Sequence, residues 1–78
     1  MAMAAEIAPG ITIASGIRFG KPVVKGTRVP VHLVVGSFAS GMAATEVAEE
    51  YGLTLDDIRA CLSYAACLVE EQEIRALA

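Results

Sequence analysis

The segment 44–63 restricts the fold of this chain more than any other stretch, because it combines two helix signals with a turn signal. Apolar residues at helical spacing predict a helix over 44–51, and Gly52 suits the positive φ at which many helices end. Thr54 followed by Asp57 comes close to a capping box, so a second helix should begin directly after Thr54. Two helices joined by so short a turn form a helix-turn-helix.

The apolar residues of this segment fit the same geometry. The inward positions are occupied by Val47, Tyr51, Leu53, Ile58 and Cys61. Ala48 stands where the two helices approach each other and only a small side chain fits. The pattern predicts how the two helices pack, whatever they are used for.

The second of these helices, from Leu55 to at least Glu71, is apolar over a wide arc. Its core stripe should contain Ile58, Cys61, Leu62, Ala65, Leu68 and Val69, widened by Tyr64, Ala66, Ile74 and Leu77. A stripe of about 100° suffices for a helix that packs on one side. The excess predicts a second packing surface, for a dimer or another protein partner.

The residues before this segment predict a β segment and one more helix. Alternating apolar residues predict a hairpin over 11–19 that turns at Ser15-Gly16 and buries four side chains, Ile11, Ile13, Ile17 and Phe19. Val23-Val24 is a brief extended piece. Pro30 and Gly41 bound a helix between them.

The expected fold class is therefore mostly α, with a short N-terminal β-hairpin followed by a three-helix helix-turn-helix unit. Residues 1–10 should form a flexible N-terminus and 11–78 a single domain. Within that domain, 11–29 should be the β segment and 30–78 the three-helix bundle.

A chain of 78 residues without Trp must build a small core from Val, Ile and Leu. Such small cores often gain stability by dimerisation, so we expect a homodimer. No apolar run reaches the roughly 18 residues of a membrane span. The first residues lack the basic start of a signal peptide, and we therefore expect a cytoplasmic protein that does not contact membranes.

Neither a metal site nor a catalytic site is evident in the sequence. On one helix Cys61 and Cys67 would point too far apart for a disulfide, and they are expected to be reduced. His32 is the only histidine, which leaves too few ligands for a zinc site. A nucleophile would have no evident base. The expectation is a binding protein, not an enzyme, without a cofactor.

Charge is divided unevenly along the chain. Residues 1–45 carry four cations against one carboxylate, whereas 46–78 carry two cations against eight carboxylates. The basic positions Arg18, Lys21, Lys25 and Arg28 fall in turns beside glycines, where they could bind the phosphates of DNA. They could equally be solvated, with Arg28 bonded to carbonyls of its own loop.

In a DNA-reading helix-turn-helix the start of the second helix faces the base edges. Thr54, Arg59 and Ser63 are the side chains that could donate hydrogen bonds there. However, Asp56 and Asp57 occupy the same helix start, and phosphates repel carboxylates. The alternative is that these helices serve only as a packing module.

Several motifs resemble the domain-of-unknown-function family numbered 433. They are Gly20-Lys-Pro-Val-Val-Lys-Gly-Thr-Arg-Val-Pro-Val31, Gly41-Met42, Tyr51-Gly-Leu-Thr-Leu-Asp-Asp-Ile-Arg-Ala60 and Tyr64-Ala-Ala66. The resemblance extends from about Ile13 to Leu68. It implies a homeodomain-like fold and a VapB-like antitoxin of a type II toxin–antitoxin pair, which masks a PIN-like, Mut7-C-related ribonuclease toxin and can bind its own promoter DNA with it.

Under this resemblance the acidic and apolar C-terminal helix would cover the toxin and the basic turns would meet DNA. The toxin-binding candidates are Tyr64, Leu68, Glu71, Ile74, Arg75 and Leu77. Arg75 could compete with the metal ion held by carboxylates of a PIN-type site, or it could simply favour the helix C-terminus.

Two features qualify the resemblance. Ala43-Ala44 replaces the Ser-Pro that often caps the second helix of the family, so this helix could fray or begin at Thr45. The Asp56-Asp57 pair resembles the pattern of the family itself, which makes DNA reading through the last helix less certain than toxin binding. Two alternatives remain: a stand-alone DNA-binding regulator, and a dimerising adaptor without nucleic-acid binding.

Overall fold

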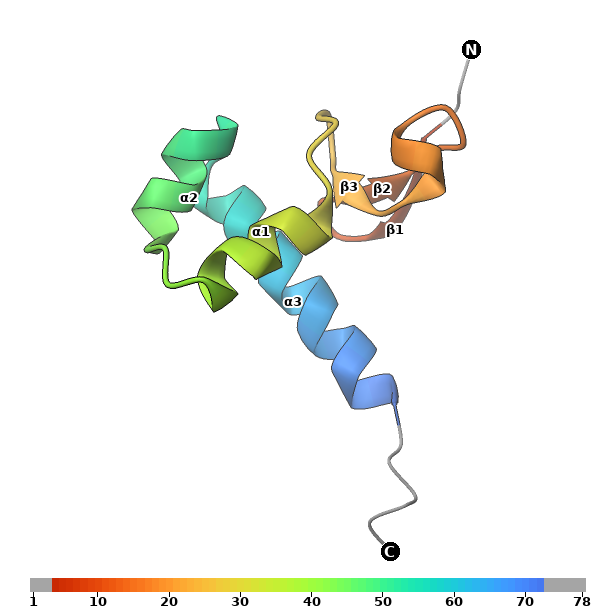
Figure 1. The fold of residues 1–78 in the computed structure, drawn as a ribbon. Helices are drawn as coiled ribbons and strands as arrows, with labels where there is room; N and C mark the ends of the chain where they lie inside the picture. The colour runs from red at the N-terminus through yellow and green to blue at the C-terminus, as the bar shows by residue number, and fades with distance from the viewer. Residues whose placement is uncertain (1–3, 73–78) are drawn as a thin grey trace, which may run out of the picture.

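The structure, a computed structural model, describes residues 4–72. A three-stranded antiparallel sheet of order β1-β2-β3 precedes three helices (Figure 1). The elements are β1 (Ala5–Ala8), β2 (Ile11–Ile13), a 3₁₀ turn η1 (Arg18–Gly20), β3 (Val23–Val24), α1 (Val31–Ala39), α2 (Ala44–Tyr51) and α3 (Leu55–Glu71). This arrangement confirms the predicted fold class, mostly α with an N-terminal hairpin and a helix-turn-helix.

The hairpin lies earlier in the chain than the sequence pattern predicts. It is formed by β1 and β2, which pair Ala5 with Ile13 and Ala8 with Ile11, so the prediction of a hairpin over 11–19 is wrong. The turn is made at Gly10, whose φ of 78° suits glycine and whose N–H donates to Glu6 Oε2 over 3.0 Å. Strand β1 therefore occupies part of the segment 1–10, where a flexible N-terminus was expected.

Phe19 is not buried, contrary to the predicted alternation. After Ala14 the chain leaves the sheet, and only a single bridge, between Ala14 and Ile17, remains around the expected turn. Arg18 and Phe19 then take left-handed backbone angles, with φ of 51° and 58°. This turn directs Phe19 outward, and its exposed fraction is 97%. Ile11 is fully buried as predicted, whereas Ile13 and Ile17 are only half-buried.

The core lies where the three helices meet the sheet. Its buried members are Ile11, Val24, Val31, Val34, Val47, Leu53, Ile58 and Cys61. The hairpin turn packs directly on α3, because a β-carbon placed on Gly10 would lie 3.0 Å from Ala60 Cβ. The sheet, which would be unstable as an isolated ribbon, is thus held against the helices.

The turn between α2 and α3 has the predicted geometry. Gly52 has a φ of 67°, and the N–H of Leu53 donates to the carbonyl of Ala48 over 2.8 Å. At the start of α3 the N–H of Asp57 donates to Thr54 Oγ1, and the N–H of Thr54 donates to Asp57 Oδ2, each over 3.0 Å. The predicted capping box is confirmed.

Helix α2 begins at Ala44 although Ala43 has no side chain that could cap it. Glu46 provides half of a capping box instead, since its Oε1 accepts from the N–H of Ala43 over 2.8 Å. The carboxylate also favours the positive end of the helix dipole. The helix therefore does not start later at Thr45.

Replacing Thr54 by alanine should lower the free energy of unfolding by about 1 kcal/mol, because the capping hydroxyl would be lost. Thr45→Ala is the matched control: Thr45 is exposed in the first turn of α2, and its replacement should change stability by less than about 0.5 kcal/mol. Urea denaturation followed by circular dichroism measures both. Equal effects would contradict a capping role for Thr54.

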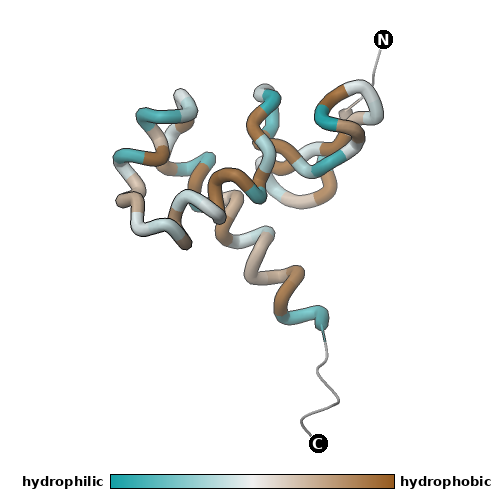
Figure 2. Tube along the Cα trace, viewed as in Figure 1, coloured by the Kyte–Doolittle hydropathy of each residue, from teal (hydrophilic) through white to brown (hydrophobic). Residues whose placement is uncertain are grey.

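The part of α3 that packs on the core ends at Tyr64. Ile58 and Cys61 are buried, but Leu62, Leu68 and Val69 are exposed, so the prediction that these three join the core stripe is wrong. The physical reason is that α1 crosses α3 at an angle and does not run along it, so that a groove separates α1 from Leu68 and Val69 (Figure 1). The last turns of α3 project from the remaining structure and carry apolar residues (Figures 1 and 2).

The two cysteines lie in different surroundings and both are free thiols. Cys61 is fully buried, and burial together with the nearby charge of Asp57 raises its pKa from 9.0 to about 11. Cys67 is exposed on α3. At about pH 8 a thiol reagent should therefore modify Cys67 alone in the folded chain and both residues after denaturation. Rapid modification of two thiols before unfolding would contradict this packing.

Candidate protein-binding and nucleic-acid-binding surfaces

The projecting half of α3 presents a continuous apolar face. Leu62, Ala65, Leu68 and Val69 recur at helical spacing along one side. The exposed fractions of Leu62, Leu68 and Val69 are 42%, 43% and 71%. We call this set the α3 face. No element among residues 4–72 covers it.

A groove of about 410 Å³ separates the α3 face from α1. Val31, His32 and Val35 form its wall on α1, and Ala65, Leu68 and Val69 form its wall on α3, with Lys21 at its rim. Most of these side chains are apolar. The groove therefore extends the α3 face into a larger surface of the same character.

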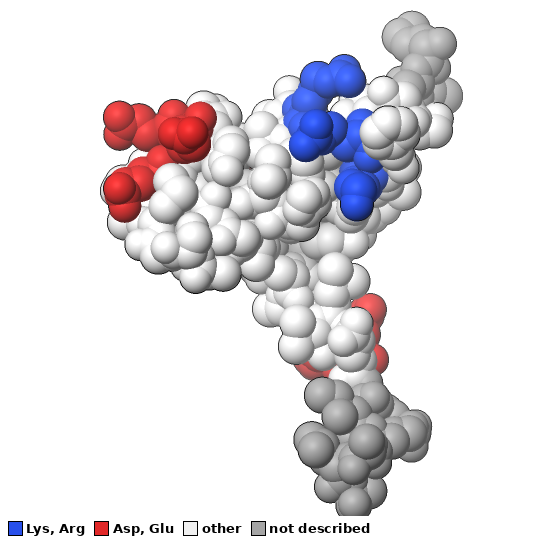
Figure 3. All heavy atoms as spheres, in the orientation of Figure 1, with Lys and Arg blue, Asp and Glu red and all other residues white. Residues whose placement is uncertain are grey.

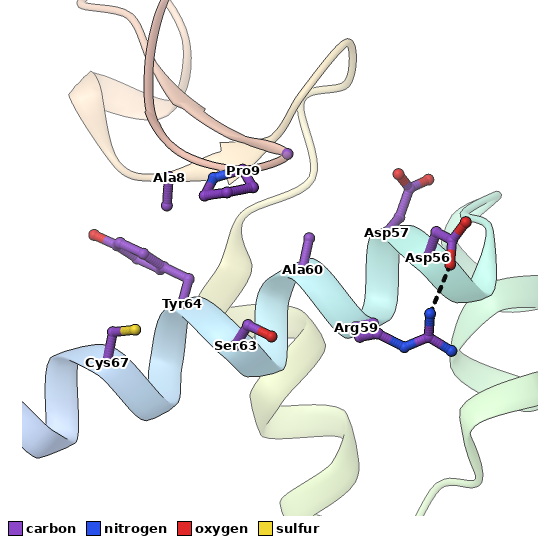
Figure 4. Close-up of a pocket in the computed structure, with 10 residues that line it drawn as sticks. Ala8, Pro9, Asp56, Asp57, Arg59, Ala60, Ser63, Tyr64 and Cys67 are labelled. Carbon is purple, nitrogen blue, oxygen red and sulfur yellow. Dashed lines mark hydrogen bonds and ion pairs between the residues drawn. The ribbon is translucent and has the colours of Figure 1, made fainter.

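The toxin-binding candidates fall into three groups. Leu68 and Glu71 are exposed on the projecting part of α3. Tyr64 is half-buried and packs against the core, with its ring below Ala8 and Pro9 of the hairpin turn (Figure 4). Ile74, Arg75 and Leu77 lie outside the residues that the structure describes. The structure thus brings Tyr64 and Leu68 to one groove and leaves the hypothesis about Arg75 open.

The four basic candidates lie on exposed loops around β3. On the face shown in Figure 3, Lys and Arg side chains gather between the turn after β3 and the loop that carries η1, whereas acidic side chains gather on α2 and near the end of α3. Arg18, Lys21, Lys25 and Arg28 are all exposed. The charge division of the sequence is therefore also a division in space.

One of these cations is paired. Lys25 Nζ lies 2.9 Å from Glu6 Oε1, and this hydrogen bond, with that from the N–H of Gly10, lowers the pKa of Glu6. The loop between β3 and α1 is closed by Thr27, whose Oγ1 donates to the carbonyl of Val24 and accepts from the N–H of Val29. Within residues 4–72 the guanidinium of Arg28 forms neither a hydrogen bond to a carbonyl of its loop nor an ion pair, so this side chain is available to a ligand.

The helix-start candidates are less available. The hydroxyl of Thr54 accepts the capping bond from Asp57. Arg59 Nη1 lies 3.0 Å from Asp56 Oδ1, an exposed ion pair drawn in Figure 4. Ser63 is exposed and lines a groove of about 490 Å³ between the hairpin turn and α3. The hairpin turn lies over this helix at Ala60 and covers that side of it (Figure 4).

Phe19 and Glu6 were not among the candidate residues. Glu6 is the partner of Lys25 across 19 positions of sequence, and no local pattern signals such a pair. For Phe19 a local signal exists, because it stands between Arg18 and Gly20 in a segment rich in turn residues. Among the described residues, no group of three or more His, Cys, Asp or Glu side chains could hold a metal ion.

None of the described helices is long and apolar enough to cross a membrane. The family model described as "Protein of unknown function (DUF433)" matches residues 11–65, and the chain belongs to this family. A crystal structure of Rv2018 from Mycobacterium tuberculosis is similar, with 33% sequence identity and a TM-score of 0.62. The match covers 67% of this chain but only 24% of that protein. No curated protein sequence matches the chain.

Proposed function

We propose that this chain is the antitoxin of a type II toxin–antitoxin pair, which binds and inhibits a PIN-like ribonuclease and also binds its own promoter DNA. In this role it is a cytoplasmic binding protein and not an enzyme. The observation that carries the proposal is the projecting half of α3, whose apolar face has no partner among residues 4–72.

The energetics of the α3 face favour a protein partner. Burying a Leu or Val side chain contributes about 1.5–3 kcal/mol, so a helix that leaves several of them in water gains stability by association. Exposed apolar patches with polar surroundings mark interaction sites. Glu70 and Glu71 follow the face directly, and carboxylates there complement the basic surface with which a ribonuclease binds RNA.

The nucleic-acid part of the proposal depends on the basic loops. Arg18, Lys21 and Arg28 are exposed and form no ion pair within the described residues. Cations of this kind supply most of the affinity for a phosphate backbone. The start of α3 is less suitable, because Arg59 is paired with Asp56 and the hairpin turn stands over Ala60.

A second candidate is favoured by the groove between α1 and α3. A second copy of the chain could place its own α3 face there, which would make the molecule a homodimeric adaptor. An antitoxin can also dimerise, so the presence of a ribonuclease partner decides between the two.

Co-expression with the neighbouring reading frame tests the proposal. The tagged chain should co-purify with a small ribonuclease and should restore growth to cells in which that ribonuclease is induced. A chain that purifies alone as a dimer and restores no growth would be an adaptor. A chain that purifies alone but binds its upstream DNA specifically would be a stand-alone regulator.

A further inference from the structure

Phe19 combines two unfavourable features at one position. Its side chain is 97% exposed, more than any other large apolar residue described. Its backbone, like that of Arg18, lies in the left-handed region, with φ of 58° and 51°. Residues with a β-carbon rarely take this conformation, and such residues cluster at binding and active sites.

The unusual turn is held by its own hydrogen bonds. The N–H of Gly20 donates to the carbonyl of Ile17, and the N–H of Lys21 donates to the carbonyl of Arg18, each over 3.1 Å. The turn follows the bridge between Ala14 and Ile17, which ties it to the sheet. The ring is thus displayed from a fixed backbone.

The surroundings of this ring are cationic. Arg18, Phe19, Lys21 and His32 line one hollow of about 190 Å³. The segment 18–28 contains four cations and no carboxylate, and of these Lys25 is paired with Glu6. Within residues 4–72, Arg18 and Lys21 form no ion pair. An aromatic face beside unpaired cations is the arrangement with which proteins bind unstacked bases and their phosphates.

We infer that Phe19 stacks on a nucleobase while Arg18 and Lys21 bind the adjacent phosphates. The base comes either from a single strand or from a duplex step that the ring opens as a wedge. Phenylalanine and arginine are also enriched at protein interfaces, so the test below includes a protein contact as an outcome that overturns the inference. The inference rests on the nucleic-acid part of the proposed function and does not depend on the ribonuclease.

Binding measurements on oligonucleotides test this assignment. The probes are fluorescein-labelled oligo(dT), an abasic strand of equal length, and a duplex copied from the DNA upstream of the reading frame. Phe19→Ala should weaken binding to oligo(dT) by about tenfold without changing the dependence of affinity on salt. It should bind the abasic strand as the wild type does. Phe19→Trp should retain the affinity, because it retains a stacking face.

Three further variants separate stacking from charge. Lys21→Ala should reduce the slope of log affinity against log salt by about one for every probe. Ile7→Ala removes an exposed apolar side chain from β1, outside the α3 face and the basic loops, and should leave nucleic-acid binding unchanged. Phe19→Gly, which suits a left-handed backbone, should fold with an unchanged or higher melting temperature and bind as weakly as Phe19→Ala.

A loss confined to oligo(dT) would assign the ring to single strands, and an added loss on the duplex would assign it to an opened base step. Wild-type affinity of Phe19→Ala for both probes would overturn the inference. A variant that keeps nucleic-acid binding but loses the co-purifying ribonuclease would overturn it in favour of a protein contact. If the wild type binds neither oligo(dT) nor the duplex, the nucleic-acid part of the proposed function fails as well, while ribonuclease inhibition is unaffected.

Discussion

Replacing both Leu68 and Val69 by glutamate should strongly weaken binding of the proposed ribonuclease partner and leave the fold intact. Two apolar contacts of about 1.5–3 kcal/mol each would be lost, and two carboxylates would be placed in an apolar interface. The expected result is a dissociation constant raised by about 100-fold or more. Calorimetric titration of the purified partner with each variant measures the change.

Ile7→Glu provides the matched control for this experiment. Ile7 is also an exposed large apolar residue, with an exposed fraction of 41%, but it lies on β1 and not on the α3 face. Its replacement should leave binding of the ribonuclease unchanged. If the double variant on α3 binds as tightly as the wild type, the partner uses another surface of the chain.

Ile58→Ala should destabilise the fold more than the loss of the Thr54 cap or any replacement on the exposed surface. Ile58 is 3% exposed and lies in the core formed by the three helices and the sheet. Removing its side chain should cost about 2–5 kcal/mol, a large part of the roughly 4–12 kcal/mol that stabilise a domain of this size. The midpoint of urea denaturation should fall accordingly.

Leu55→Ala is the control on the same helix. Leu55 stands three residues earlier but is 53% exposed, so its replacement should change stability by less than about 0.5 kcal/mol. Equal losses at Leu55 and Ile58 would mean that α3 packs on the core through a different face.

Elements with local signals were predictable from the sequence. The capping box of Thr54 and Asp57, the left-handed Gly52 and the spacing of Val47, Ile58 and Cys61 all act within a few residues of the positions they specify. Each signal therefore predicted the helix ends and the packing of the helix-turn-helix without knowledge of the remaining chain.

The errors arose where the structure depends on distant contacts. Alternation over 11–19 suggested a hairpin, but β2 pairs with β1 and the chain then turns away at Ile17. The angle at which α1 crosses α3 decides how much of α3 is covered, and no pattern within α3 itself contains that information. Leu62, Leu68 and Val69 look like core residues in the sequence for this reason.

The candidate surfaces were predictable from the sequence only where they depend on local signals and not on distant contacts. The exposure of Arg18, Lys21 and Arg28 was predictable from their place in turns. The excess of apolar residues on α3 was predictable from the wide apolar arc of that helix. The pairing of Lys25 with Glu6 depends on the sheet, which brings β1 beside β2 and the following loops. The display of Phe19 depends on the left-handed backbone of Arg18 and Phe19; the neighbouring turn residues signal a turn there, but not this conformation.

The proposed ribonuclease partner is expected from the neighbouring reading frame, and its activity on a labelled RNA tests the central claim most directly. The wild-type chain should suppress cleavage at equimolar concentration, the Leu68→Glu and Val69→Glu double variant should not, and Ile7→Glu should suppress it as the wild type does. Cleavage that continues unchanged in the presence of the folded wild-type chain would contradict the assignment of this protein as an antitoxin.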